Sequence, residues 1–390
     1  MNAMLAAAVC IGAAAADAPV PAEQGVLTDS YLLRAERALQ LARDDVPAMT
    51  EAADRAAARL AAGGAFYAAG QASMVSELCG RAGGFMALKS LGSAVPADGD
   101  VVVYSQPPGE PIPDGIGGSA ALVIVLGGTG AGEGGFGFPN HAAEAGISPT
   151  LANAIPGWLF TGELVAALTR LGKMPVMFES IGMYGGYARM ARYREKGIFW
   201  HDEHSVPALP GGEVAGRYID TVSGMLRRVE AEERGNLNRA GAWAAEGKGA
   251  GHRVIMYSMG HLFPAEVADT AIADVFESAV WNSGFMQSSV PDHEYAPGDV
   301  LIHIGYQHAP YRLLERARPA GARVVYVDVM CHRDYTGDED VIWIDPMWPW
   351  PDGCVALEGY DVPILPASGI VNGAIAWEIY RVTEACLRGE

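Results

Sequence analysis

The feature that most constrains the fold is an order of segments that occurs twice. Near the start, a helical stretch from Asp29 ends in Gly63-Gly64, and a short apolar strand, "AFYAAG", then stops at Gly70. From Arg217 a long helical stretch again ends in glycines, and the strand "HRVIMYSMG" follows. Each strand is followed by a second helical segment. An order repeated at this scale predicts an internal duplication.

The second copy continues as alternating strands and helices. The segments "PGDVLIHIGYQ", "APYRLLERARPAG" and "ARVVYVDV" read as strand, helix and strand. This pattern predicts parallel strands joined by a right-handed crossover. We therefore expect an α/β fold of two tandem, doubly wound, three-layer αβα domains with parallel sheets. Pro and Gly near residue 210 mark the boundary, so the domains would cover residues 26–209 and 210–390.

Residues 1–25, "MNAMLAAAVCIGAAAADAPVPAEQG", lie outside the predicted fold as a signal-like or disordered N-terminus. The apolar stretch and the small residues before Asp17 fit a cleaved signal, but no Lys or Arg precedes them. The stretch is too short and too rich in alanine to span a bilayer. The interpretation stays open between a cytoplasmic and an exported protein.

Charge excludes some partners. The chain has 46 Asp and Glu against 27 Lys and Arg, a net charge of −19. Such a charge repels phosphate backbones and anionic lipids, so we expect neither nucleic acid nor a membrane as partner. Five cysteines without paired spacing indicate no zinc or disulfide framework. Half of the residues are hydrophobic, enough for a sizeable core and a subunit interface.

Several strings, taken in order, resemble the sugar isomerase (SIS) domain superfamily: "GGAFYAAGQAS" with "SELCGRAGGF", then "MYSMGHLFPAEV", "PGDVLIHIGYQHAPYRLLERARPAGARVVYVDV" and "LPASGIVNGAIAWEI". The resemblance covers most of residues 30–390. It implies a tandem SIS-like, flavodoxin-type fold that binds a phosphosugar or related carbohydrate at the carboxyl edge of a sheet. It also implies a homo-oligomer, expected as a dimer, because SIS-like sites are often completed across subunits. We expect no cofactor.

Isomerase members of the superfamily move a carbonyl through an enediol, with a carboxylate or histidine as proton shuttle. Glu77 stands where phosphoheptose isomerases and muramic acid phosphate etherases carry a catalytic acid, and Glu266 is its counterpart in the second copy. His261 and His308 lie in loops after strands, where a side chain would face a ligand. The plainer alternatives are a solvent-facing helix acid and a histidine that caps a turn.

The superfamily usually holds phosphate in a Ser/Thr-rich loop, but the corresponding loop at Gly305–His308 has no hydroxyl residue. The glycine-rich loop at Gly127–Gly130 offers backbone amides instead. Serines at such places are turn or cap residues by default, and we expect Ser368 to N-cap the last helix. The substrate-binding candidates are Gly70, Gln71, Ser73, Ser105, Thr129, Ser258, Gly305, Gln307 and Ser368.

Two further clusters have alternative interpretations. His201, Asp202 and His204 could supply two or three metal ligands, but such loop clusters are mostly solvated, and we predict no metal site. The tryptophans of "IDPMWPWPDG" and Trp343 before them could stack on sugar rings, or they could pack as a rigid loop over the sheet.

Two functions follow. The first is an aldose–ketose type isomerase that acts on a sugar or sugar phosphate through carboxylate and histidine acid–base chemistry. The alternative is a non-catalytic module that binds or senses a carbohydrate derivative, which the loops poor in hydroxyl residues favour. The sequence names neither the sugar nor its phosphorylation.

Overall fold

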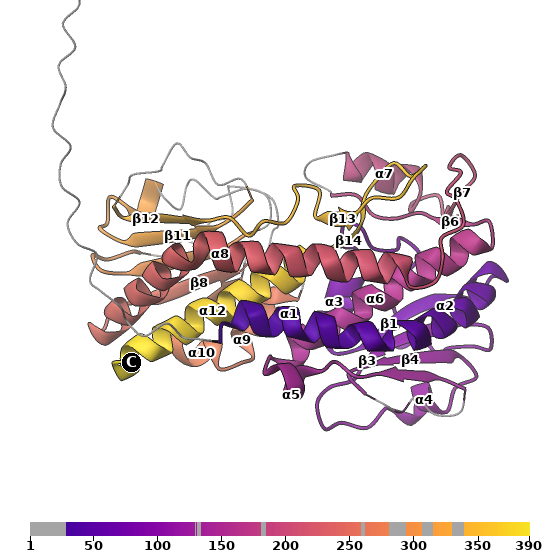
Figure 1. Ribbon diagram of the computed structural model, residues 1–390, viewed down its shortest axis with the longest axis horizontal. Helices are drawn as coiled ribbons and strands as arrows, with labels where there is room; N and C mark the ends of the chain where they lie inside the picture. Colours follow the sequence, from indigo (N-terminus) through magenta and orange to yellow (C-terminus); the bar gives the residue numbers. More distant parts are fainter. Residues whose placement is uncertain are drawn as a thin grey trace, which may run out of the picture.

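The computed structural model describes residues 29–128, 130, 134–180, 185–258, 262–280, 294–305, 315–329 and 339–390. Two five-stranded sheets lie toward opposite ends of the molecule (Figure 1). The first has the order β2 (Lys89–Ser90), β1 (Phe66–Gly70), β3 (Val101–Ser105), β4 (Leu122–Leu126), β5 (Phe136–Phe138). The second has the order β9 (Glu277–Val280), β8 (Val254–Ser258), β10 (Val300–Ile304), β11 (Arg323–Val327), β12 (Val341–Ile344).

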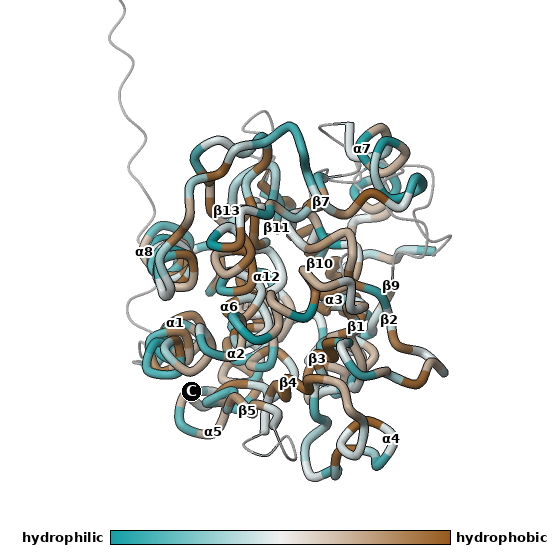
Figure 2. The backbone as a smooth tube through the Cα atoms, turned by 90° about the vertical axis from the view of Figure 1, so that its right-hand side faces the viewer, coloured by the Kyte–Doolittle hydropathy of each residue, from teal (hydrophilic) through white to brown (hydrophobic). Residues whose placement is uncertain are grey.

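Every strand pair within these two sheets is parallel. In chain order both sheets follow the 2-1-3-4-5 arrangement of flavodoxin-type folds. The strands β3, β4, β8 and β10 are buried along their whole length, as continuous apolar runs in parallel sheets should be. Figure 2 shows these hydrophobic segments inside a more hydrophilic periphery. The predicted fold class is confirmed.

The five longest described helices pack against one another: α1 (Tyr31–Leu41), α2 (Val46–Ala61), α6 (Pro149–Arg170), α8 (Glu213–Gly249) and α12 (Ser368–Arg388). The long helix α8 runs beside both α1 and α12 across the length of the molecule (Figure 1). The first helix therefore packs against helices from the second half of the chain. The domain boundary near residue 210 stays a prediction.

Helix α6 is buried on all sides. Among the described residues it is the one helix long and apolar enough to cross a membrane, and its apolar window is entirely buried in the protein. A helix that is apolar all round is typical of a protein core. Its buried Glu163 accepts hydrogen bonds from the backbone N–H groups of Gly212 (2.8 Å) and Ala215 (3.2 Å). This carboxylate fixes the start of α8, because the N-terminus of a helix favours negative charge.

The remaining described elements are short: the 3-10 turn Ala42–Asp45, α3 (Ala72–Leu78), α4 (Asp114–Gly117), α5 (Ala142–Ala145), α7 (Gly186–Arg192), α9 (Phe263–Ala268), α10 (Ile272–Val275), and the antiparallel pairs β6 (Met174–Pro175) with β7 (Trp200–His201) and β13 (Gly353–Val355) with β14 (Ile364–Pro366). The helical segment that we expected after the strand "AFYAAG" is short. It ends at Leu78, and Gly80 and Gly83 then turn the chain with positive φ.

Candidate functional site

Polar side chains meet at the carboxyl ends of β1 and β3. The Ser105 hydroxyl donates to Gln71 Oε1 at 2.9 Å. Asn153 Nδ2 donates to the same oxygen at 2.8 Å and lies 3.2 Å from Ser105 Oγ. Ser105 and Asn153 are buried, whereas Gln71 is partly exposed. The structure thus brings two predicted site residues, Gln71 and Ser105, onto one asparagine of helix α6.

Further amides surround this group. Asn140 Nδ2 donates to Asn153 Oδ1 at 2.7 Å. The glycine-rich loop lies directly on the amides, because a Cβ on Gly127 would lie 2.3 Å from Asn153 Oδ1 and one on Gly128 would lie 2.0 Å from Gln106 Oε1. Asn140 and Gln106 are both partly exposed. The carboxyl edge of the first sheet is therefore a rim of neutral amides over a buried serine and asparagine.

Gly70 is required by the backbone at this edge. Its φ is +96°, and a Cβ there would lie 1.9 Å from the Ser105 carbonyl oxygen. The next residue, Gln71, is the N-cap of α3, so Ser73 is the second residue of the helix and not its cap. The close approach of two strands explains the glycine without any ligand.

Glu77 lies on α3 and is completely buried, so the alternative of a solvent-facing acid is wrong, and its catalytic role stays a prediction. Its Oε1 accepts from Trp158 Nε1 at 3.2 Å, and its Oε2 accepts from the backbone N–H of Leu262 at 3.1 Å. Burial raises the pKa of the Glu77 carboxyl more than the nearby Arg81 guanidinium lowers it. A Cβ on Gly369 would lie 2.3 Å from Glu77 Oε1, so glycine lets α12 approach the carboxylate.

Arg81 connects this carboxylate to the second half of the chain. Its guanidinium lies 3.5 Å from Glu77 and 2.8 Å from Asp352, and it donates to the Ser368 hydroxyl. Ser368 is the first residue of α12, and Ala367 is the N-cap. The expected Ser368 cap is therefore wrong: Asp352 Oδ1 accepts from the Ser368 N–H at 2.9 Å and does the capping.

Glu266 has a similar environment in the second half. It is buried on α9, and its Oε1 accepts from Trp377 Nε1 at 2.8 Å. Burial raises the pKa of its carboxyl. Within the described part of the chain, no hydrogen bond links either glutamate to Gln71 or Ser105. The structure therefore does not bring the predicted catalytic acids into contact with the polar rim.

The other predicted residues lie elsewhere. Ser258 ends β8 and is buried. Gly305 follows β10, and its carbonyl accepts from Asn372 Nδ2 at 2.9 Å. His261, His308, Gln307 and Thr129 lie outside the described residues.

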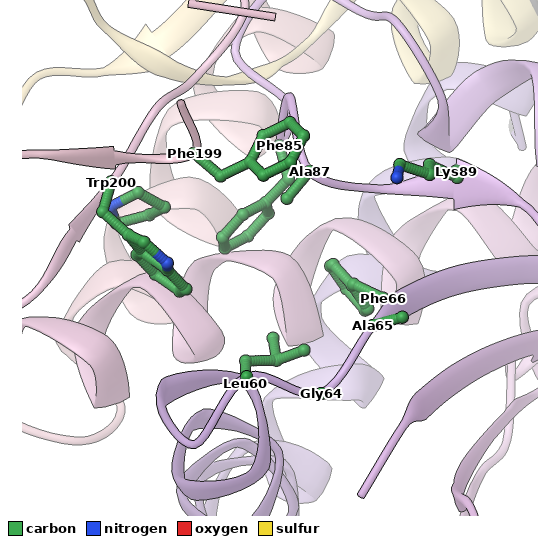
Figure 3. Close-up of a pocket in the computed structure, with 11 residues that line it drawn as sticks. Leu60, Gly64, Ala65, Phe66, Phe85, Ala87, Lys89, Phe199 and Trp200 are labelled. Carbon is green, nitrogen blue, oxygen red and sulfur yellow. The ribbon is translucent and has the colours of Figure 1, made fainter. Parts of the chain in front are cut away.

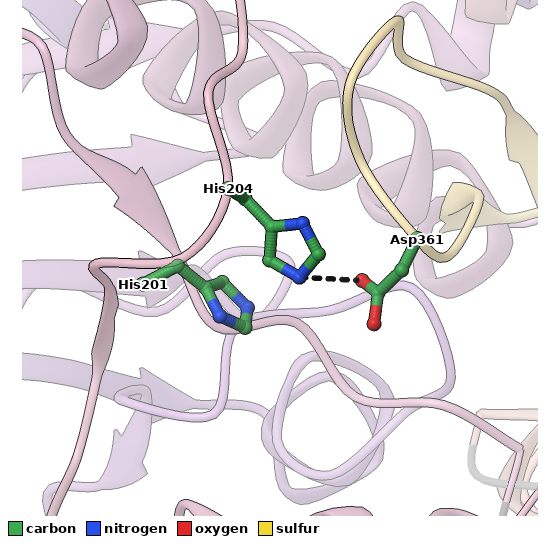
Figure 4. A group of neighbouring side chains, drawn as sticks. All are labelled: His201, His204 and Asp361. Atoms are coloured by element: carbon green, nitrogen blue, oxygen red, sulfur yellow. Dashed lines mark ion pairs between the residues drawn. The ribbon is translucent and has the colours of Figure 1, made fainter.

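His201, His204 and Asp361 offer ligand atoms within 4.8 Å of one another (Figure 4). Arg189 holds Asp361 through two contacts of 2.5 and 3.1 Å, and its Nη2 lies 3.3 Å from His201 Nε2. Burial raises the pKa of the Asp361 carboxyl and Arg189 lowers it, and the net shift is downward. A guanidinium already contacts two of the three ligands, which weighs against a metal ion because two cations at this distance repel. Asp202 is exposed and joins none of these contacts.

The tryptophans do not form one stacking platform. Trp343 lies in β12 and stacks on Tyr326 with ring centroids 4.6 Å apart. Trp348 is buried, and its Nε1 donates to Asn372 Oδ1 at 3.0 Å. For these two residues the packing interpretation holds.

Sequence reasoning missed Asn153, Asn372 and Arg81. Each asparagine is the fifth residue of its helix, α6 or α12, and each helix carries tryptophan at its tenth position. Aligning "TLANAIPGW" with "GIVNGAIAW" would have revealed both pairs. Arg81 lies within the string "SELCGRAGGF", but no local signal marks it as a buried partner of Glu77.

The fold and this edge define the class of protein: a doubly wound α/β protein with two parallel sheets and a polar carboxyl edge on the first. No family model matches the chain. A UPF0309 protein from Streptomyces griseus is 24% identical over 202 residues, which are 43% of this chain and 80% of that protein.

Solved structures with limited similarity to this chain span most of its length. They include the C-terminal domain of glucosamine-fructose-6-phosphate aminotransferase from Francisella tularensis (11% identity, TM-score 0.47, 94% of this chain and 98% of that one). A candidate phosphosugar isomerase from Silicibacter pomeroyi DSS-3 has 14% identity and a TM-score of 0.44 over 92% and 98% of the two chains. A candidate sugar-binding protein from Salmonella typhimurium LT2 has 10% identity and a TM-score of 0.45 over 92% and 99%. No site residue is carried over from them.

Proposed function

We propose that the protein binds a sugar or sugar phosphate at the carboxyl edge of its first sheet. The observation that carries the proposal is the hydrogen-bonded group of Gln71, Ser105 and Asn153, with the partly exposed amides of Gln106 and Asn140 around it. Amides and hydroxyls both donate and accept hydrogen bonds, as sugar hydroxyls require. Ligands of doubly wound folds bind outside the carboxyl ends of the strands.

An unphosphorylated sugar fits this edge better than a phosphosugar. The hydrogen bonds among Gln71, Ser105 and Asn153 are all made by neutral groups. A phosphate would depend on backbone N–H groups of the glycine-rich loop, because the described residues that form this edge include no Arg or Lys of the kind that strengthens most phosphate sites.

Calorimetric titration tests this proposal with glucose, glucosamine, N-acetylglucosamine and their 6-phosphates. We expect saturable binding of at least one sugar, weakened at least tenfold by Gln71→Leu and by Asn153→Leu. The matched control is Asn372→Leu, which alters the same helix position in the second half and should leave the affinity unchanged. Absence of binding by the whole panel, or affinity indifferent to both Gln71 and Asn153, would contradict the proposal.

Acid–base catalysis by Glu77 is a second candidate function, with sugar isomerisation as the reaction. The observation that favours it is the raised pKa of this buried carboxyl, since a catalytic acid–base group must hold and release a proton near neutral pH. Both carboxyl oxygens are engaged, by Trp158 and by the Leu262 N–H, so transfer to a sugar requires these contacts to open.

An aldose–ketose assay with the bound sugar tests Glu77→Gln against Glu266→Gln. If Glu77 carries the reaction, Glu77→Gln lowers turnover about a hundredfold or more with little change in sugar affinity. Binding without turnover by the wild-type protein would leave the non-catalytic module as the function.

We also propose a homo-oligomer, most simply a dimer. Light scattering at micromolar concentration should then give about twice the chain mass, and a mass near 41.0 kDa would contradict it.

A further inference from the structure

A cavity of about 270 Å³ opens at the other edge of the first sheet, where β1 begins (Figure 3). Phe66, Phe85, Phe199 and Trp200 line it together with Leu60. The proposed sugar site lies at Gly70 and Gln71, where the same strand ends. The cavity and the sugar site are therefore separate places in the fold.

The walls of the cavity are aromatic and come from separate parts of the chain. Phe66 in β1 and Phe85 in the turn after α3 meet edge to face, with ring centroids 5.5 Å apart and planes at 88°. Phe199 lies directly before β7, and Trp200 is the first residue of that strand. Aromatic rings prefer edge-to-face or offset stacking partners, so one more ring could fill the space between them. An apolar cavity of only about 150 Å³ accommodates benzene, so this volume is sufficient for one or two fused rings.

Two lysines lie over the outer rings of this cavity. Lys89 Nζ lies 5.5 Å from the centroid of Phe199, and Lys173 Nζ lies 5.4 Å from that of Trp200. Of the four lysines in the whole chain, Lys89 lines the cavity and Lys173 lies beside its Trp200 wall. In a protein with a net charge of −19, such a local concentration of positive charge favours an anionic group at the mouth.

We propose that this cavity is a second binding site, for a small aromatic carboxylate. Its ring would lie among Phe66, Phe85 and Trp200, and its carboxylate would face Lys89 and Lys173 at the mouth. Burial of the ring supplies the affinity. The two ammonium groups select the anion over a neutral molecule of the same shape.

Calorimetric titration with indole-3-acetate, and with indole as the neutral counterpart, tests this site. We expect saturable binding of indole-3-acetate and binding of indole at least about fivefold weaker. Lys89→Gln combined with Lys173→Gln should weaken indole-3-acetate about tenfold and leave indole unchanged, given the usual strength of contacts with exposed cations. The matched control Lys248→Gln removes a lysine of the second half and should change neither affinity.

Ala87→Leu fills the cavity from its lining and should abolish binding of both compounds. Sugar titration of the same variant separates this site from the proposed sugar site, because its sugar affinity should remain that of the wild-type protein. The proposal is overturned if indole-3-acetate does not bind, or if Ala87→Leu binds it normally. Equal affinity for indole would show that the cavity takes neutral apolar molecules and would overturn the assignment of an acid.

Discussion

An asparagine at the same helix position lies at the carboxyl edge of each sheet, Asn153 in α6 and Asn372 in α12, but the two make different contacts. In the first half, Asn153 holds Gln71 and Ser105 under partly exposed amides and a glycine-rich loop. In the second half, Asn372 donates to the Gly305 carbonyl and accepts from the buried Trp348 indole. One helix position thus supports an edge with solvent-reaching polar groups in one half and an aromatic packing contact in the other.

The hydrogen bonds between a buried glutamate and a tryptophan, in contrast, are similar in the two halves. The carboxylate–indole pairs Glu77–Trp158 and Glu266–Trp377 are alike in both halves. All four side chains are buried or nearly so, and each indole satisfies a carboxyl oxygen that would otherwise lose its hydrogen bond with water. The shared pairs contribute to the packing of both halves, whereas the proposed sugar site lies where the halves differ.

The largest expected effect concerns the ion network between the halves. Arg81→Met leaves Glu77 and Asp352 buried without their cation, so we expect a loss of about 3–5 kcal/mol in the free energy of unfolding. Urea denaturation measures it. The control Arg55→Met breaks an exposed i,i+4 pair with Glu51 and should cost less than about 1 kcal/mol. Similar costs for the two variants would mean that the buried network does not hold the halves together.

The ends of the corresponding strands β1 and β8 differ, because β1 ends at Gly70 and β8 ends at Ser258. In Gly70→Val the side chain would collide with the Ser105 carbonyl oxygen, and the valine backbone would have to adopt a positive φ. We therefore expect a loss of about 3 kcal/mol in the free energy of unfolding. The control Gly115→Val lies in open space with an ordinary φ and should cost about 1 kcal/mol or less. Thermal unfolding compares the two. Sugar titration of folded Gly70→Val then shows whether the turn serves a ligand as well, and undiminished affinity would leave it a structural turn.

The second sheet contains a buried histidine, His303. His303 is the fourth residue of β10, where Tyr104 stands in β3, and burial lowers its pKa to about 3. Below pH 6.5 the unfolded chain gains a proton here that the folded protein refuses, so stability falls as the pH falls. The loss reaches about 2 kcal/mol at pH 5, and most of it develops below pH 6.5. Urea titrations should show a shallower dependence for His303→Gln, and an unchanged slope would refute this origin.

Ser73 should matter least. It is the second residue of α3, and Gln71 holds the cap position. We expect Ser73→Ala to change the free energy of unfolding by less than about 0.5 kcal/mol. A calorimetric loss of sugar affinity in this stable variant would extend the polar edge to Ser73, and unchanged affinity would limit it to Gln71, Ser105 and the neighbouring amides.

Part of this site was open to prediction. Gly70, Gln71 and Ser105 were candidates because strand ends and glycine turns have local signals in a sequence, and the structure places them at the carboxyl ends of β1 and β3. Their binding of a sugar stays a proposal. The apolar run "VLIHI" likewise predicted a buried parallel strand. Asn153 was missed because a single asparagine in an apolar helix has no periodic signal. The burial of Glu77 was not predicted because glutamate usually lies at the surface.

The sequence by itself determined the two parallel sheets, their order along the chain and the glycine turns at their edges. These features depend on hydrophobic period and backbone conformation, which neighbouring residues encode. Only the tertiary structure decided that Glu77 is buried under Leu262 and that Arg81 pairs with Asp352, contacts that join residues 185 and 271 positions apart. The state of a polar side chain depends on which distant segments cover it, and local sequence does not record that packing.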